Sequence, residues 1–249
     1  MTAAPQAISP DDKPLSQVER VVDTFIAPTK TFTDIRRNAS WWLPYILVAV
    51  SWCLMAYVAD VKVGMDAIVN NQLQLSPKQA EKLDQLPPEQ RAEQLRITVK
   101  GTRIFWLYIA PILALVFGAI VAGVSMGTFN FGFGAELKFS QCMAVFMYTS
   151  LPLIIKPLLA ISVLLAGGNE GFTFQNPVAS NLGILIDPNS HFLYNIMTAI
   201  DLFTIWSLLL AGLAYSCITR VKRGTCMAVV FAWWAIMTLF FAGLGALFA

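Results

Sequence analysis

Charged side chains are scarce in this sequence: Asp, Glu, Lys and Arg make up 13% of its 249 residues, against about 25% in an average soluble domain. Apolar residues make up 57%. This balance excludes an ordinary soluble domain and indicates an all-α, polytopic membrane protein. The net charge of +2 comes from scattered basic residues, so it gives no reason to expect a nucleic-acid partner.

Histidine and cysteine are also rare. A single histidine excludes metal sites of the H-E-x-x-H type and His-rich transport sites. The four cysteines stand singly in or beside apolar runs, at Cys53, Cys142, Cys217 and Cys226, a pattern typical of free thiols rather than disulfides. The last three fall near the inner ends of the predicted spans, which allows a thiolate cluster, but free thiols explain them equally well. We predict neither a metal site nor a cofactor.

The N-terminal segment is polar and contains three prolines, and we predict that residues 1–15 are disordered. It lacks the short apolar core of a signal peptide, which we therefore do not expect. From Ser16, a suitable N-cap, apolar residues recur at helical spacing on both sides of Pro28. They are Val18, Val21, Val22, Phe25, Phe32 and Ile35.

This pattern predicts two short amphipathic helices, for which two placements remain open. In one, they lie on the membrane surface with Arg36 and Arg37 near the lipid headgroups. In the other, they pack beneath the helix bundle. The two placements are compatible.

Five apolar runs then predict five transmembrane helices, because each approaches the roughly 20 residues that a bilayer core requires. They cover about 41–59, 104–127, 139–166, 192–218 and 226–248. Trp41 and Trp42 open the first run as interfacial residues. Pro152 and Pro157 predict a bend in the third. Residues 16–248 are thus predicted to form one membrane domain.

The polar segment 61–103 predicts a small helical insertion outside the membrane. Ser76 and Pro77 predict the start of one helix, and Glu89 begins another that continues into the second span. The charges of this segment are mixed in sign, which favours a solvated surface over a ligand site.

Lys and Arg residues predict the orientation of the chain. With a cytoplasmic N-terminus, the inner segments carry nine and the outer insertion carries seven. The short loops decide the matter: Arg36 and Arg37 precede the first span, and Arg220, Lys222 and Arg223 separate the fourth from the fifth. We predict that the N-terminus is inside and the C-terminus outside.

One ionisable pair lies within the apolar runs. Lys156 precedes the end of the third span by about ten residues, or roughly 15 Å, and Asp201 follows the start of the fourth by roughly 13 Å. The two residues are therefore predicted to lie at the same depth. Thr204, Ser207 and Ala211 continue the Asp201 face of the fourth span as a polar, small-residue stripe.

Two interpretations of this candidate polar site stay open. Lys156 and Asp201 form a structural ion pair at the centre of the bundle, or they line a proton pathway, an ion pathway or a cavity for a lipid headgroup.

The segment Gly123-Val-Ser-Met-Gly127 matches the G-x-S-x-G pattern of serine hydrolases. That pattern requires a strand-to-helix turn, but here it falls inside a predicted membrane helix. The single histidine, His191, is predicted near the opposite membrane face from Ser125. We interpret Ala119, Gly123 and Gly127 as a small-residue ridge for helix packing, and we predict no catalytic residues.

The outer loop 168–191 combines turn signals with apolar residues. Asn176-Pro177 and Asp187-Pro188-Asn189 are turn signals, and Phe172, Phe174, Leu182, Ile184, Leu185 and Ile186 are apolar. We expect this loop to fold back onto the bundle as a cap.

The order of these features resembles the Yip domain family, which is named for proteins that interact with Ypt/Rab GTPases. The resemblance covers about residues 18–248. It rests on five segments: Phe25-Ile-Ala-Pro28 with Phe32 and Ile35, Trp41-Trp42-Leu-Pro44, Tyr148-Thr-Ser-Leu-Pro152, Asn176-Pro177, and Asp201-Leu-Phe-Thr-Ile-Trp206. The last segment is similar to an aspartate-phenylalanine-tryptophan signature of bacterial members. Trp206 is expected to be a structural residue of this signature.

This resemblance implies a five-helix integral protein of the bacterial inner membrane with a cytoplasmic N-terminus. Eukaryotic relatives bind Rab GTPases in vesicle transport. This chain lacks their long N-terminal region, so Rab binding is not expected of it.

Two functions remain open. The first is a non-enzymatic adaptor or organiser that contacts the lipid bilayer and other membrane proteins. The alternative is a transporter or lipid-handling protein that uses Lys156 and Asp201.

Overall fold

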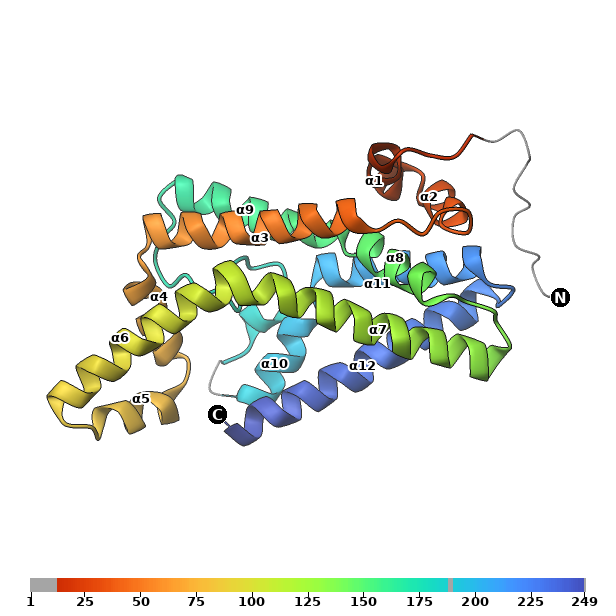
Figure 1. The fold of residues 1–249 in the computed structure, drawn as a ribbon. Helices are drawn as coiled ribbons and strands as arrows, with labels where there is room; N and C mark the ends of the chain where they lie inside the picture. Colours follow the sequence, from red (N-terminus) through yellow and green to blue (C-terminus); the bar gives the residue numbers. More distant parts are fainter. Residues whose placement is uncertain (1–12, 188–189, 249) are drawn as a thin grey trace. The chain divides into compact units, whose positions relative to one another are not determined.

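The computed structural model describes residues 13–187 and 190–248 (Figure 1). Within these residues every regular element is helical, apart from one isolated β-bridge between Asn181 and Asp201. Most of the segment predicted to be disordered, and the turn residues Pro188 and Asn189, lie outside the described residues. Residues 13–16 form no regular element.

Two compact units divide the chain. Unit 1 contains the described residues up to 49, together with 113–154 and 204–235, and unit 2 contains 50–112, 155–203 and those from 236 onward. Each unit has a hydrophobic core of its own.

Four helices in the described residues are long and apolar enough to cross a membrane. They are α3 (Trp42–Lys62), the continuous helix Pro88–Phe133, the segment Phe139–Leu165, and α12 (Arg223–Phe248). They correspond to the first, second, third and fifth predicted spans. The prediction of an all-α membrane bundle is confirmed.

The fourth span was predicted as one helix over 192–218, and this is wrong. The structure has two helices, α10 (His191–Ala199) and α11 (Leu202–Ile218), separated by Ile200 and Asp201. Ile200 leaves the helical region at φ −79° and ψ 79°. Neither residue is a proline or glycine, so local sequence contains no breaker, and the cause is a set of tertiary hydrogen bonds around Asp201 described below.

In unit 1, α8 (Phe139–Thr149) is the central helix. Most of its side chains are buried, from Cys142 to Thr149. Around it lie α7 (Ala110–Phe133) from residue 113, α11 from residue 204 and α12 to residue 235. Phe129 of α7 stacks on Tyr215 of α11 with ring centroids 4.5 Å apart. Cys142, Cys217 and Cys226 belong to this same core.

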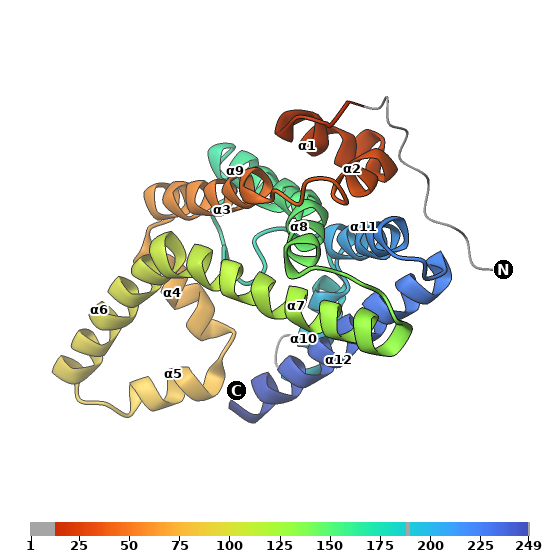
Figure 2. The ribbon, with the colours of Figure 1, turned by 45° about the vertical axis from the view of Figure 1, so that its right-hand side comes forward.

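The N-terminal helices α1 (Gln17–Ile26) and α2 (Pro28–Asp34) lie beside α8 in unit 1 (Figures 1 and 2). Ser16 and Glu19 form a capping box: the Ser16 amide donates to Glu19 at 2.7 Å, and the Glu19 amide donates to the Ser16 hydroxyl at 3.2 Å. This pair satisfies two N–H groups that a helix start leaves free. Pro28 begins α2, where its missing N–H costs nothing.

In unit 2, the end of α3 packs against α9 (Ile155–Leu165) and α4 (Met65–Gln74). Small residues, including Ala59 and Ala160, lie at this core. The outer loop adds Phe172 and Phe174, which are 7% and 2% exposed. The Asn71 side-chain amide donates to the Phe172 carbonyl at 3.1 Å. The expectation that the loop folds back is therefore confirmed for this part.

The rest of that loop is different. It contains the short 3₁₀ helix η3 (Leu182–Leu185), whose side chains Ile184 and Leu185 are 58% and 75% exposed. These residues do not join the core of unit 2.

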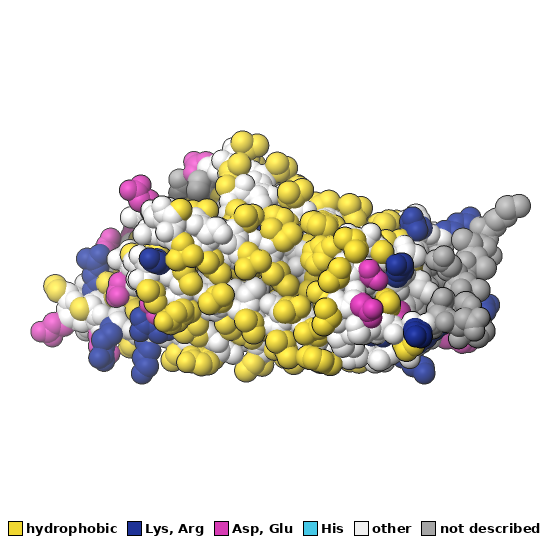
Figure 3. Space-filling view, turned by 90° about the horizontal axis from the view of Figure 1, so that it is seen from above, with side chains coloured by type: hydrophobic (Ala, Val, Ile, Leu, Met, Phe, Trp, Pro, Cys, Tyr) yellow, Lys and Arg dark blue, Asp and Glu magenta, His cyan; other side chains and the backbone are white. Residues whose placement is uncertain are grey.

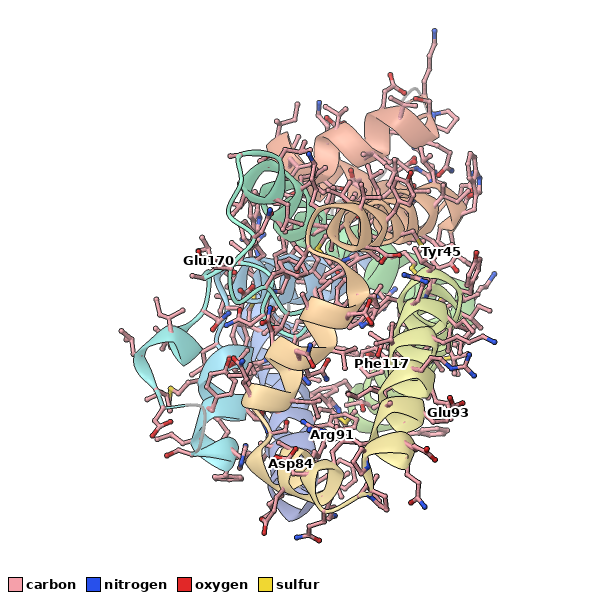
Figure 4. The ribbon with its side chains drawn as sticks, turned by 90° about the vertical axis from the view of Figure 1, so that its left-hand side faces the viewer. Tyr45, Asp84, Arg91, Glu93, Phe117 and Glu170 are labelled. Atoms are coloured by element: carbon pink, nitrogen blue, oxygen red, sulfur yellow. The ribbon has the colours of Figure 1, made fainter. Side chains whose placement is uncertain are left out.

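The predicted polar insertion forms α4, α5 (Pro77–Asp84) and α6 (Pro88–Ile104). Asp84 and Arg91 face one another across the α5–α6 turn (Figure 4), with oxygen and nitrogen 2.9 Å apart. Both side chains are at least half exposed, so this pair contributes little to stability.

A π-helical turn, η1 (Phe105–Ile109), joins α6 to α7. Pro111 has no N–H to donate to the Leu107 carbonyl one turn earlier. The Cys53 thiol of α3 lies 3.6 Å from that carbonyl and donates to it. A cysteine that the sequence marks only as a free thiol thus satisfies a carbonyl freed by proline.

The third span is also interrupted. A 3₁₀ segment, η2 (Leu151–Ile154), contains Pro152 and separates α8 from α9. Pro157 lies in the first turn of α9, where helical N–H groups have no partner in the helix. The Ser150 hydroxyl donates to the Phe146 carbonyl at 2.7 Å.

Candidate functional site

Lys156 and Asp201 are brought together in unit 2. The Lys156 ammonium nitrogen lies 3.2 Å from Asp201 Oδ2. The aspartate side chain is 1% exposed and the lysine side chain 14% exposed. Lys156 comes from the first turn of α9, and Asp201 from the break between α10 and α11.

Asp201 also caps α11. Its Oδ1 accepts a hydrogen bond from the Phe203 amide at 3.0 Å. Aspartate is favoured immediately before a helix because its side chain satisfies a free amide there, and its negative charge faces the positive end of the helix dipole. The break in the fourth span therefore has a local function, since it places a carboxylate at a helix start.

The outer loop closes over this carboxylate. The Ser180 hydroxyl donates to Asp201 Oδ2. The Leu202 amide donates to the Ser180 carbonyl at 3.0 Å, and the Leu182 amide donates to the Ile200 carbonyl at 3.2 Å. These backbone bonds replace the helical bonds that a continuous span would make at this point.

Asp201 is thus held by an ammonium group, a hydroxyl and a backbone amide of the same chain. Such bonds are needed to compensate a buried carboxylate for lost hydration. Removing Lys156 alone leaves this charge without its counter-ion, at a typical cost of about 3–5 kcal/mol.

The predicted polar stripe on the fourth span is divided between the units. Thr204 and Ser207 are half-buried in the part of α11 that belongs to unit 1, whereas Lys156 and Asp201 belong to unit 2. Trp206 is half-buried in unit 1, where its ring meets Phe25 of α1 edge to face at 5.8 Å.

A second buried ion pair was missed by the sequence reasoning. Arg20 of α1 is completely buried, and its guanidinium lies 2.6 Å from the Asp34 carboxylate of α2. It also donates to the Asn38 carbonyl at 2.7 Å. In the sequence, Arg20 contributed only to the positive-charge count. The clue was an arginine on the same helical face as Thr24, opposite the valines.

The residues predicted at the membrane surface have different environments. Arg36 and Arg37 are exposed, and Trp42 is 52% exposed. Trp41 is half-buried against the core of unit 1, and its ring meets Tyr45 edge to face at 6.3 Å. Trp41 thus packs partly against the core of unit 1, and the assignment of both tryptophans to the lipid interface stays a prediction.

The predicted glycine ridge is not a packing site within unit 1. A Cβ atom added to Gly123 or Gly127 would meet no described heavy atom within 4 Å. The close approach occurs earlier in the same helix, where a Cβ on Gly118 would come 2.8 Å from the Phe146 ring. The role of Gly123 and Gly127 in helix packing stays a prediction, and Gly118 is the glycine of this helix that makes a close contact within unit 1.

The G-x-S-x-G segment does not form the turn that a serine hydrolase requires, because Ser125 lies inside the helix α7. No group of three His, Cys, Asp or Glu side chains in residues 13–187 and 190–248 is arranged to hold a metal ion.

The sequence model of the Yip1 domain matches residues 22–244. Neither the curated proteins nor the solved structures contain a significant match to the chain. The matched range includes all four long apolar helices, the outer loop and Asp201. The chain is therefore a multi-pass integral membrane protein that belongs to the Yip1 domain family.

Proposed function

We propose that this protein is a non-enzymatic adaptor that organises lipids and other proteins within the membrane. The main support is the state of Asp201, whose carboxylate is already bound by Lys156, Ser180 and the Phe203 amide. A carboxylate so engaged braces α9, the outer loop and α11 and does not offer an open ligand site. Interaction surfaces are then provided by the apolar helix faces.

The proposed orientation follows the positive-inside rule. Arg36 and Arg37 before α3, and Arg220, Lys222 and Arg223 before or at the start of α12, lie on the cytoplasmic side. The C-terminus then lies on the other side. For a bacterial chain this membrane is the inner membrane.

The alternative is transport of an ion or handling of a lipid headgroup through the same pair. One observation favours it: the Lys156 side chain is 14% exposed, so this side chain is not wholly buried. Ionisable residues within membrane helices frequently serve such pathways.

The two functions are separated by Lys156→Met/Asp201→Asn, which removes both charges while asparagine keeps the capping oxygen for the Phe203 amide. The variant and the wild-type protein are reconstituted into liposomes, and proton flux and lipid scrambling are measured. Because an adaptor carries no flux, we expect both proteins to match empty liposomes.

A matched measurement in cells completes the test. Membrane proteins and lipids crosslinked to the wild-type chain are expected to be crosslinked to the double variant as well, with Asp201→Asn alone as the destabilised control. Flux through the wild-type protein that disappears in a normally folded double variant would establish the transport alternative and overturn the adaptor proposal.

A further inference from the structure

The helix α1 exposes its apolar face and buries its polar face. Its apolar residues Val18, Val22 and Ile26 recur at helical spacing and are 66%, 49% and 75% exposed. The opposite face contains Arg20 and Thr24, both completely buried. An ordinary helix at the surface of a soluble domain buries its apolar face and exposes its polar one.

The buried polar face is held by hydrogen bonds and an ion pair within unit 1. The Thr24 and Thr31 hydroxyls donate to the Arg20 carbonyl at 2.7 Å and 2.9 Å. The Arg20 guanidinium binds Asp34. The Tyr148 hydroxyl of α8 donates to the Gln17 side chain at 2.8 Å. These bonds fix the rotation of α1 about its own axis. Its apolar face therefore points away from the core of unit 1.

The contacts of α1 place it at membrane depth. Tyr148 lies nine residues into the spanning segment that begins at Phe139, which is roughly 14 Å along the helix. Trp206, which meets Phe25 edge to face, lies twelve residues before the end of α11 at Ile218, or roughly 18 Å. A helix that touches both residues lies beside the apolar helices of unit 1 and not beyond their ends.

The direction of α1 agrees with this position. In Figure 1, α1 is seen nearly along its axis while α11 runs across the view, so α1 crosses the spanning helices of unit 1. Figure 3 shows the side on which α1 lies, where hydrophobic side chains are exposed together with acidic and basic ones. In unit 1, Ile46 and Leu47 at the start of α3 are also exposed, at 44% and 37%.

We propose that α1 is an in-plane lipid-binding helix, whose face of Val18, Val22, Phe25 and Ile26 contacts the acyl chains of one leaflet. The occupant is lipid because α1 contacts Tyr148 and Trp206 within apolar helices of unit 1, and the exposed apolar side chains of a membrane protein meet acyl chains at that level. The short connection from Asp34 to Trp42 keeps the end of α2 near the start of α3 in unit 1. The inference does not depend on the adaptor function.

The test introduces the photocrosslinking residue benzoylphenylalanine into the full-length chain in cells, in place of Val22 or Ile26. Leu54 of α3, 47% exposed, is the lipid-facing reference, and Lys82, exposed on α5, is the matched control outside the membrane. We expect phospholipid adducts at positions 22 and 26 in yields comparable to the yield at position 54. At position 82 we expect no lipid adduct. A second copy or another protein as the main product would overturn the proposal, as would absence of lipid adducts at both positions.

A second measurement covers the case in which the bulky probe disturbs folding. Val22→Lys/Ile26→Lys is compared with Val22→Leu/Ile26→Leu in lipid nanodiscs. Charges on a lipid-facing surface are unfavourable, so the lysine variant is expected to lower the Tm and the leucine variant to leave it unchanged. Equal Tm values for the two variants would contradict lipid contact at this face.

Discussion

Arg20 and Asp34 form a buried ion pair between two helices that meet at Ala27, with Arg20 completely buried and the Asp34 side chain 8% exposed. Each helix is too short to be stable alone. The pair joins them and also orients α1, because the same arginine binds the Asn38 carbonyl beyond α2. The packing of α1 against α2 thus depends on the buried charge of Arg20, which is far in sequence from the Lys156–Asp201 ion pair.

Arg20→Met is expected to destabilise the protein by about 3–5 kcal/mol, because it leaves the Asp34 carboxylate buried without a counter-ion. Arg20→Met/Asp34→Leu is expected to recover a large part of this loss. Thermal unfolding in detergent measures both. Arg96→Met is the matched control, since Arg96 pairs with Glu93 in an exposed position, and it should leave the Tm unchanged. A double variant as unstable as Arg20→Met would argue against the ion pair as the cause.

Ser180→Ala is expected to cost about 1.5–3 kcal/mol, because it removes a hydrogen bond to a charged, buried carboxylate. Since Ser180 joins the outer loop to the break at Asp201, protease cleavage within residues 168–187 should also become faster. Ser190→Ala is the control, because the Ser190 hydroxyl does not cap α10. Equal cleavage of both variants would show that this hydroxyl does not hold the loop.

Gly118→Ala and Gly123→Ala form a matched pair on one helix. The first places a methyl group 2.8 Å from the Phe146 ring and is expected to destabilise by about 1–3 kcal/mol through overpacking. The second meets open space and is expected to be neutral or slightly stabilising, because alanine is the better helix former. Unfolding in detergent compares them. A large loss at Gly123 would place another chain against that position.

Glu19 makes α1 sensitive to acid. The backbone amide and the hydroxyl of Ser16 lower the pKa of Glu19 below its ordinary value of 4.5. A lowered pKa stabilises the folded helix above pH 4.5, and this contribution is lost as the pH falls through the lower folded value. The Tm difference between the wild-type protein and Glu19→Gln should therefore shrink as the pH is reduced below 4.5. A constant difference between pH 7 and pH 3 would contradict this linkage.

Much of the fold follows from the apolar runs, because length and composition decide whether a helix can cross a bilayer. The long helices and the polar insertion were predictable on this basis. The break at Ile200 and Asp201 was not, since it depends on Ser180 and Leu182, which are brought there by the outer loop. A run of apolar residues contains no information about such a tertiary contact.

The candidate site was partly predictable for a related reason. Counting residues from the ends of two spans placed Lys156 and Asp201 at one depth, and the structure brings them together. The same method misjudged the surroundings, because Asp201 lies at a helix start and not inside a helix. Arg20 escaped notice because the polar face opposite the valines is normally the solvent-exposed face of an amphipathic helix, whereas here it is buried.

The distance in sequence between Lys156 and Asp201 has a consequence for biogenesis. The ribosome completes α9, the outer loop and α10 before it adds Asp201. The third span therefore reaches the bilayer while its lysine has no counter-ion, at an insertion cost of about 2.5–3.5 kcal/mol. Synthesis of the fourth span then supplies the carboxylate that pairs with this lysine. Nascent chains halted before Asp201 would present an unfinished membrane segment to the quality-control machinery of the cell.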